Sequence, residues 1–267
     1  MLNVFMIGDI VGRPGRSAVT SLINKYRKRF NLDLIIANGE NAAGGNGITS
    51  DIVQELFNNN IDIITMGNHT WDKREILEFI DHEPNLIRPA NYPLGTPGKG
   101  SVVVKLSDNL KVGVINLSGR VFLSPLDCPF RVAEEIVAKM KRETPIIIID
   151  FHAEATSEKI AFGWFMDGKV SAVIGTHTHV QTADERILPQ GTGYITDVGM
   201  TGPRDSVLGV KTELVIDKFL SQMPVRFEVA AGVAQLNGLL LSINEATGKT
   251  ESIQRIQEYM ELKNSST

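Results

Sequence analysis

Short runs of apolar residues recur along the chain and are separated by longer segments of mixed character. The clearest runs are rich in Ile, Val and Leu, and each ends at a glycine or a polar turn. This composition and length favour buried strands over helices. The predicted strands cover residues 4–7, 34–37, 61–64, 146–151 and 170–175.

Between these strands the apolar positions follow the helical period. Helices are predicted over residues 15–30, 50–58, 73–80, 130–141 and 157–166. Thr49, Ser50 and Asp51 are candidate caps for the second helix, and Asp72 is a candidate cap for the third. Strands that alternate with helices indicate an α/β fold.

Two regions depart from this alternation. Residues 102–105 and 111–117 are predicted to pair as a hairpin, and residues 226–229 and 238–243 are predicted as further strands in the last third of the chain. We therefore expect a mixed sheet or two stacked sheets.

Composition limits the class of protein. The chain has 267 residues, 42% of them hydrophobic and 22% charged, which is enough for one substantial core. We expect a single domain over 1–267, with 263–267 as a flexible tail. A formal net charge of -4 gives no general attraction to a polyanion, so no extended nucleic-acid surface is expected.

The cellular location is predicted from two features. Cys128 is the only cysteine, which excludes an intrachain disulfide and is compatible with a reducing cytoplasm. The chain begins without a basic secretory n-region, and its apolar runs are too short for a membrane helix. We expect a cytoplasmic protein with no membrane partner.

Polar residues with metal-binding chemistry follow the predicted strands. Oxygen ligands suit Mn, Mg or Fe, and imidazoles suit Fe, Mn, Zn or Ni, so the mixture argues against calcium and against a thiolate site. Because functional groups of α/β folds gather at the carboxyl ends of strands, these residues predict a two-metal hydrolase site. They are Asp9, Glu40, Asn41, Asn68, His69, His152, His177 and His179.

Taken singly, each residue has an ordinary structural explanation. A lone His152 is more often a hydrogen-bonded core histidine, and a lone Asn68 is more often a turn residue. The His177 and His179 pair is stronger, because alternate residues of a strand point to the same side. Their joint occurrence favours function, since only His82 of the five histidines lies outside the candidate positions.

The motifs resemble those of the calcineurin-like metallophosphoesterase superfamily. Within it the chain is similar to the bacterial YmdB-like branch, which acts on cyclic nucleotides, and the similarity extends through 67–73, 88–91, 151–159 and 195–203. The resemblance implies a four-layer α/β/β/α sandwich of two mixed β-sheets flanked by helices. The matching motifs are Gly8-Asp9, Gly39-Glu40-Asn41, Gly67-Asn68-His69, His152 and Gly175-Thr176-His177-Thr178-His179.

The resemblance also implies roles for these residues. Two divalent ions, Fe or Mn, would share Glu40. The first ion would also bind Asp9, Asn41 and His179, and the second would also bind Asn68, His152 and His177. A hydroxide bridging the metals would attack phosphorus, with His69 as the general acid.

The sequence departs from the wider superfamily at three places. The usual Asp-x-His start is Asp9-Ile10-Val11, so one imidazole is absent, and the branch uses the amide oxygen of Asn41 instead. Glu40 stands where most relatives have Asp. Thr70 stands where many have an acidic residue after the catalytic His. Asp72 could orient His69 in its place, or could simply cap the next helix.

The function predicted is a metal-dependent phosphodiesterase for small cyclic nucleotides, with 2′,3′-cyclic nucleotides favoured by the resemblance. Two alternatives use the same residues: a phosphomonoesterase on the same dinuclear site, and a metal-binding signalling protein that binds nucleotide without turnover. We expect a homo-oligomer, because symmetric assemblies are common among soluble enzymes.

Overall fold

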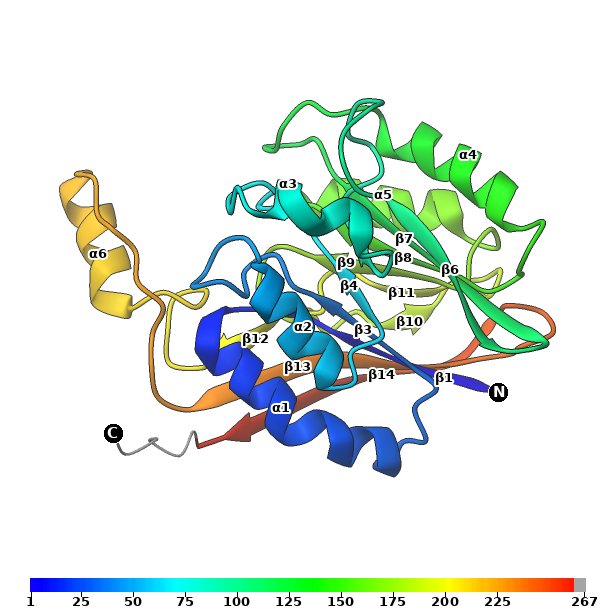
Figure 1. The fold of residues 1–267 in the computed structure, drawn as a ribbon, viewed down its shortest axis with the longest axis horizontal. Coiled ribbons are helices and arrows are strands. Elements are labelled where there is room, and N and C mark those ends of the chain that lie inside the picture. The colour runs from blue at the N-terminus through cyan, green and yellow to red at the C-terminus, as the bar shows by residue number, and fades with distance from the viewer. Residues whose placement is uncertain (262–267) are drawn as a thin grey trace.

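Two β-sheets lie face to face in the computed structural model, which describes residues 1–261 (Figure 1). The sheets form the two inner layers, and helices cover their outer faces. The predicted four-layer arrangement of two mixed sheets flanked by helices is therefore confirmed. The predicted flexible tail at 263–267 lies outside the described residues.

The first sheet has the order β2-β12-β13-β1-β3-β4-β5, and β14 pairs with β13. Neighbours from β1 to β5 are parallel, whereas β13 is antiparallel to both β1 and β14. Its strands are β1 (Leu2–Ile7), β2 (Asp9–Ile10), β3 (Leu34–Asn38), β4 (Ile63–Thr65), β5 (Leu86–Ile87), β12 (Met200–Pro203), β13 (Ala234–Ile243) and β14 (Thr250–Met260). The helices connecting its strands are α1 (Gly12–Arg29), α2 (Ser50–Asn58) and α3 (Ile76–Phe79), the last followed by a 3-10 turn, Ile80–His82.

The second sheet has the order β10-β11-β9-β8-β7-β6. Its central strands are parallel and its two outer strands are antiparallel, so it is also mixed. Its strands are β6 (Ser101–Ser107), β7 (Leu110–Ser118), β8 (Ile147–His152), β9 (Ala172–Thr176), β10 (Arg186–Ile187) and β11 (Gly193–Ile195), with α4 (Pro129–Met140) and α5 (Thr156–Met166) between them.

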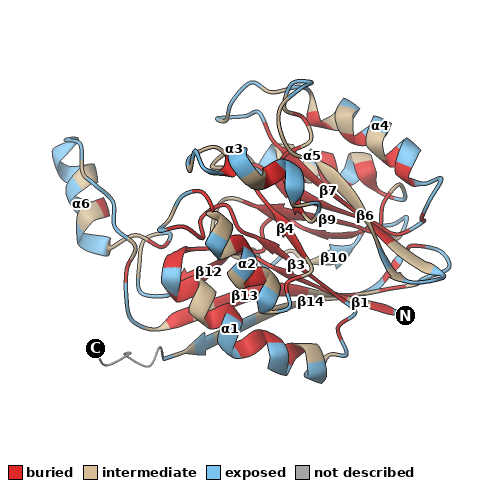
Figure 2. Cartoon of the chain, viewed as in Figure 1, coloured by how far each residue is buried: buried red, intermediate tan, exposed pale blue. Residues whose placement is uncertain are grey.

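Alternation along each strand creates the layers. In β1, Val4 and Met6 join the apolar cluster between the sheets, whereas Phe5 and Ile7 join the cluster under the helices. A third cluster packs α4 and α5 against the second sheet. Figure 2 shows the buried residues concentrated on the strands and on the inner faces of the helices. The strands β3, β4, β8 and β9 are buried on both faces, which explains their continuous apolar runs.

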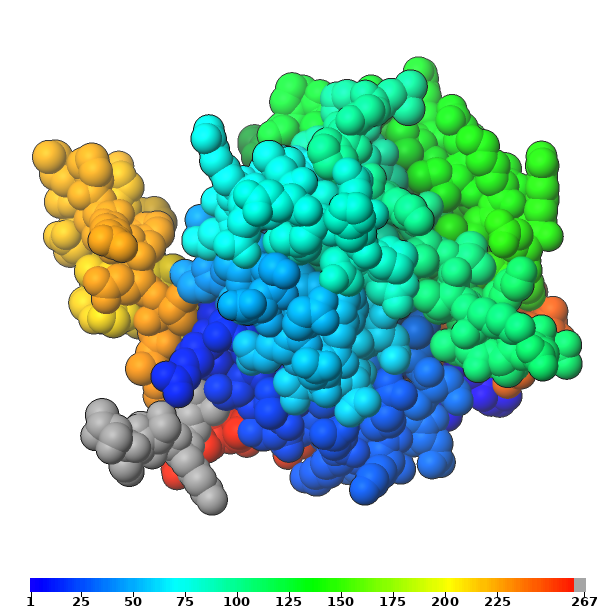
Figure 3. Space-filling view, viewed as in Figure 1, coloured from blue at the N-terminus to red at the C-terminus, as the bar shows by residue number. Residues whose placement is uncertain are grey.

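Five details of the structure differ from the sequence prediction. Residues 226–229 form no strand, and an unpredicted helix, α6 (Thr212–Ser221), projects from the body just before them (Figures 1 and 3). The long strand β14 was not predicted. Thr49 occupies the N-cap of α2 without a side-chain cap bond, and α3 begins at Ile76 rather than residue 73.

Within residues 1–261, no helix is long and apolar enough to cross a membrane.

Candidate metal centre

The carboxyl ends of strands from both sheets meet at one place. Asp9 follows β1, Glu40 follows β3, and His152 ends β8. Gly67 allows the close approach, because a Cβ added there would lie 2.4 Å from both Glu40 Oε2 and His152 Nε2. Strand ends that are far apart in sequence therefore place their polar side chains together, as the apolar runs predicted.

Three acceptor groups surround a single ring nitrogen of His152. Its Nε2 lies 3.0 Å from each of Glu40 Oε1, Asn68 Oδ1 and His177 Nδ1. One N–H cannot serve three partners, so protein hydrogen bonds alone leave lone pairs facing one another. Glu40, His152 and His177 each offer an atom within 4.8 Å of the others, which is a grouping that could hold a metal ion.

The opposite nitrogen of the His152 ring is fixed by a buried chain of hydrogen bonds. The Thr176 hydroxyl donates to Asp150 Oδ1 at 2.7 Å, so it accepts from His152 Nδ1 at 2.9 Å. Asp150 is fully buried and also accepts from Asn38 Nδ2 at 3.2 Å. Carboxylates that orient a ligating histidine in this way are typical of metal sites. The sequence contained a signal for this, because Asp150 interrupts an apolar strand.

A second group of candidate ligands lies beside the first. His179 Nε2 is 3.2 Å from Asn41 Oδ1 and 4.0 Å from Asp9 Oδ1. That oxygen of Asp9 is buried and has no hydrogen-bond partner. Burial raises the pKa of Asp9 to about 6. A buried carboxylate oxygen without a donor is costly unless a cation compensates it.

The charge of the site is set mainly by Glu40 and His152. Burial opposes ionisation of Glu40, but the adjacent His152 outweighs it and lowers the pKa of Glu40 to about 2. Burial likewise opposes a charged His152, yet Glu40 raises the pKa of His152 to about 9. The pair is therefore ionised in the metal-free protein, and a metal ion would take the place of the proton on Nε2.

Asp72 orients the ring of His69. His69 Nδ1 lies 2.8 Å from Asp72 Oδ2, and since a carboxylate only accepts, Nδ1 carries the hydrogen and donates it. Asp72 also accepts from Asn46 Nδ2 at 3.0 Å. The backbone N–H of His69 donates to Glu40 Oε2 at 2.9 Å. Of the two roles considered for Asp72, the geometry supports the one toward His69, and Asp72 lies before α3 rather than at its cap.

His177 and His179 reach the site from a loop and not from a strand. β9 ends at Thr176, and the two histidines have positive φ angles of 100° and 65°. The expectation that strand alternation aligns them was therefore wrong. Non-glycine residues in this conformation cluster at functional sites, where surrounding contacts hold them. Here Glu154 Oε2 lies 3.0 Å from His177 Nε2, and Leu208 O accepts from His179 Nδ1 at 3.0 Å.

A buried ion pair supports this loop from behind. Lys159 Nζ lies 2.6 Å from Asp197 Oδ2 and donates to Thr176 O at 2.6 Å. Asp197 in turn accepts from the backbone N–H of Thr178 at 3.0 Å and of Gly199 at 2.8 Å. Sequence reasoning missed this pair, although its members lie in the similar segments 151–159 and 195–203, because they are far apart in sequence and only the fold brings them into contact.

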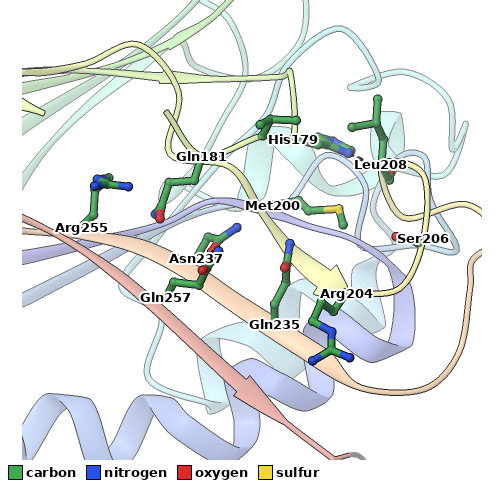
Figure 4. Close-up of a pocket in the computed structure, with 11 residues that line it drawn as sticks. His179, Gln181, Met200, Arg204, Ser206, Leu208, Gln235, Asn237, Arg255 and Gln257 are labelled. Atoms are coloured by element: carbon green, nitrogen blue, oxygen red, sulfur yellow. Dashed lines mark hydrogen bonds between the residues drawn. The ribbon is translucent and has the colours of Figure 1, made fainter. Parts of the chain in front are cut away.

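A cavity of about 360 Å³ lies beside His179 (Figure 4). Its wall is mainly polar, with amide side chains from β13 and β14. His179 and Leu208 line one end, and Arg204 and Ser206 lie on the chain leading to α6. The root of the projecting helix therefore adjoins the candidate centre.

The donor set fits two divalent cations. Both groups offer oxygen and imidazole ligands, a mixture that suits divalent metal ions. The unpaired oxygen of Asp9 and the three groups around His152 Nε2 each lack a partner that a cation would provide. The structure thus brings together every candidate ligand predicted from the sequence, with His69 at the edge of the cluster.

Comparisons with known proteins identify the family of the chain. The family model described as YmdB-like protein matches residues 5–256. The 2′,3′-cyclic-nucleotide 2′-phosphodiesterase of Bacillus subtilis is 54% identical over 96% of both chains. A putative phosphatase/phosphodiesterase of Mycoplasma genitalium is 38% identical, over 96% of this chain and 92% of the relative.

Solved structures show the same fold. A novel phosphatase from Mycoplasma pneumoniae has a TM-score of 0.91 at 36% identity, covering 97% of this chain and 94% of the other. A hypothetical protein from Thermus thermophilus has a TM-score of 0.90 at 38% identity, covering 97% and 99%. The chain therefore belongs to the YmdB-like family of metallophosphoesterases.

Proposed function

We propose that this chain is a metal-dependent phosphodiesterase that hydrolyses 2′,3′-cyclic nucleotides. The observation that carries the proposal is the convergence of Glu40, Asn68 and His177 on His152 Nε2, beside the unpaired oxygen of Asp9. The name of the Bacillus subtilis relative, which is 54% identical, supports the choice of substrate.

Each candidate residue then has a role. We assign Asp9, Glu40, Asn41 and His179 to the first metal, and Glu40, Asn68, His152 and His177 to the second. Iron or manganese suits these donors best. When bound, the two ions supply Lewis-acid stabilisation of the phosphate oxygens and activation of water.

The protein itself moves a proton and orients the substrate. Because His69 Nδ1 donates to Asp72, Nε2 is the atom left to carry a proton to the leaving oxygen. The oxygen of water forms a bond to phosphorus as the bond from phosphorus to O2′ breaks, and O2′ takes the proton from His69. The proton that the water loses passes to solvent, from which His69 regains its own. The product is a nucleoside 3′-phosphate, in line with the relative's name.

The remaining parts of the proposal concern the whole chain. We infer that it acts as one domain, because the proposed ligands come from both sheets. A small phosphoester is its partner, and iron or manganese its resident metal. The reducing cytoplasm suits a chain with one cysteine.

The decisive experiment compares metal-stripped protein with protein reconstituted with Mn²⁺ or Fe²⁺ under anaerobic conditions. The initial rate of 2′,3′-cyclic AMP hydrolysis should be negligible in the stripped protein and restored by metal. His82→Ala is the matched control, since His82 lies in the 3-10 turn after α3, and its rate should equal that of the wild type. A fully metallated wild type without hydrolysis would reject the substrate.

A second candidate activity is phosphomonoester hydrolysis by the same site. The Mycoplasma relatives are named as putative phosphatase/phosphodiesterases, which favours testing it. Parallel assays with p-nitrophenyl phosphate and a cyclic nucleotide distinguish the two by their ratio of kcat/KM. Stoichiometric nucleotide binding without turnover would instead favour the binding-protein alternative.

A further inference from the structure

Helix α6 carries an apolar stripe that faces solvent. We call the segment from Leu208 to Phe227 the α6 arm. In Figures 1 and 3 it stands away from the two sheets. Its exposed apolar residues include Ile216 (51% exposed), Phe219 (73%), Leu220 (81%) and Met223 (63%). Ile216, Phe219 and Leu220 are spaced by three and four residues, which places them on one face of the helix. Met223 follows just after the C-cap of the helix at Gln222.

The arm is a defined structure held at its base. Lys211 N donates to Glu228 O at 3.0 Å, and Ala230 N donates to Gly209 O at 2.9 Å, so the two ends of the arm are tied together. Val215 is buried, which fixes the side of the helix that faces inward. The exposed stripe is therefore displayed in one orientation.

A helix of this length gains little stability from its own hydrogen bonds. α6 has 10 residues, and isolated helices shorter than about 12–15 residues are marginal in water. Helices of this size are normally stabilised by packing an apolar face, and in α6 the most apolar face is the exposed one. The arrangement points to a partner that covers the stripe.

The exposed area matches one side of a protein dimer. Leu208 and Phe227 are also about half exposed and extend the apolar surface of the arm. If a large apolar side chain has roughly 200 Å² of surface, the arm exposes on the order of 700 Å². Stable interfaces bury about 800 Å² per partner, whereas the largest apolar patch of an ordinary monomer is about 300–600 Å².

The charges of the arm suit a second copy of this chain. Between Leu208 and Phe227 lie three basic residues and two acidic ones: Lys211, Lys218, Arg226, Glu213 and Asp217. The arm is therefore close to neutral, so two identical arms would not repel each other, and it lacks the basic excess expected for a polyanionic partner. An isologous pairing needs only one self-complementary patch.

We propose that two copies of this chain associate through their α6 arms, with the stripe of one packed on the same stripe of the other. Because Leu208 O accepts from His179 Nδ1, this interface would lie next to the candidate metal centre of each copy. The proposal identifies a surface for the expected homo-oligomer and does not depend on the proposed activity.

The first test is the mass of the protein in solution by sedimentation velocity. The wild type should have twice the mass of the chain, or an even multiple of it. Phe219→Asp with Leu220→Asp should weaken association by roughly 100-fold, because charges would be buried at the centre of the interface. Phe122→Asp, at another highly exposed aromatic position outside the arm, should leave association unchanged.

A second test locates the interface directly. In a Cys128→Ser background, Leu220→Cys should be joined to a second copy by a short bis-maleimide linker, whereas Leu94→Cys, on a fully exposed loop, should not. An unchanged melting temperature confirms that each variant is folded. The proposal would be overturned if the wild type were monomeric at a protein concentration about 100 times the Kd of a nanomolar dimer. It would also be overturned by a dimer that survives both Asp substitutions and is not cross-linked at Leu220→Cys.

Discussion

At the scale of single residues, the proposed role of His69 as general acid depends on which nitrogen of its ring is free to face the substrate. Asp72 accepts from Nδ1, so Nε2 is left for the substrate. His69 also contributes a backbone N–H to Glu40, which a substitution at its side chain leaves in place. The proposed catalytic role of His69 can therefore be tested separately from metal binding.

We predict that His69→Ala lowers kcat by roughly 10²–10⁴-fold, the usual contribution of a general acid. Its metal content, measured by inductively coupled plasma mass spectrometry, should equal that of the wild type, because the proposed ligands are unchanged. A variant that keeps its metal and its full activity would remove His69 from the mechanism.

Asp72→Ala should have a smaller effect on the same step. Without the carboxylate the His69 ring can rotate or change tautomer, and supporting residues of this kind typically contribute about 10–100-fold. We expect kcat to fall within that range while KM changes little. A large rise in KM with kcat unaffected would indicate that Asp72 contacts the substrate instead.

The candidate ligands could be recognised in the sequence more readily than the residues that hold them in place. The proposed ligands stand directly after apolar strands, so local pattern is enough to find them. Lys159 and Asp197 could not be found in this way, because only the tertiary fold brings them within 2.6 Å. Asp72 had two reasonable roles in the sequence, and a distance was needed to choose between them.

At the scale of secondary-structure elements, the buried Lys159 and Asp197 pair joins α5 to the loop after β9. We predict that Lys159→Met destabilises the metal-free protein by about 3–5 kcal/mol, because it leaves the buried Asp197 without its partner. The measurement is the free energy of unfolding in urea. Adding Asp197→Asn should restore part of the lost unfolding free energy. If the double variant instead lost as much unfolding free energy as the two single variants together, the residues would act separately.

The turn after β4 is predicted to tolerate no side chain at Gly67. A Cβ there would meet Glu40 Oε2 and His152 Nε2 at 2.4 Å. We expect Gly67→Ala to displace these groups and lower the number of bound metal ions per chain. Gly95→Ala is the control, since a Cβ at Gly95 meets no atom within 4 Å. Two bound ions in Gly67→Ala would show that the proposed second metal site can shift to accommodate a methyl group.

Elements were predicted where their burial is simple. Strands buried on both faces have continuous apolar runs, and the helices covering them have one apolar face. Among the described residues β14 pairs with β13 alone, and after Thr250 its residues are half-buried or exposed. Its alternation of apolar and polar positions is therefore weak. Residues 226–229 have the composition of a strand, yet they form the return segment of the α6 arm, where no sheet edge is available beyond the isolated bridge to Val210.

At the scale of the whole molecule, the candidate metal centre connects the two sheets. Asp9 lies in the first sheet and Glu40 follows its strand β3, whereas His152 ends β8 of the second sheet and His177 follows β9 of that sheet. In the metal-free protein this connection places a carboxylate oxygen of Asp9 in a buried position without a donor. Function therefore has a stability cost that bound metal would offset.

We predict that Asp9→Asn is more stable than the wild type when metal is absent and loses this advantage when metal is bound. Without metal, the variant should be more stable than the wild type by about 1–3 kcal/mol, because a neutral amide replaces an unpaired buried carboxylate. The backbone N–H of His177 can still donate, at the present 3.3 Å, to the amide oxygen of the new side chain. With Mn²⁺ at about 100 times its Kd, the wild type should gain about 2.7 kcal/mol and the variant much less. Thermal unfolding with EDTA and with Mn²⁺ measures both differences, and a variant less stable than the wild type in EDTA would show that Asp9 is needed for folding as well as for metal binding.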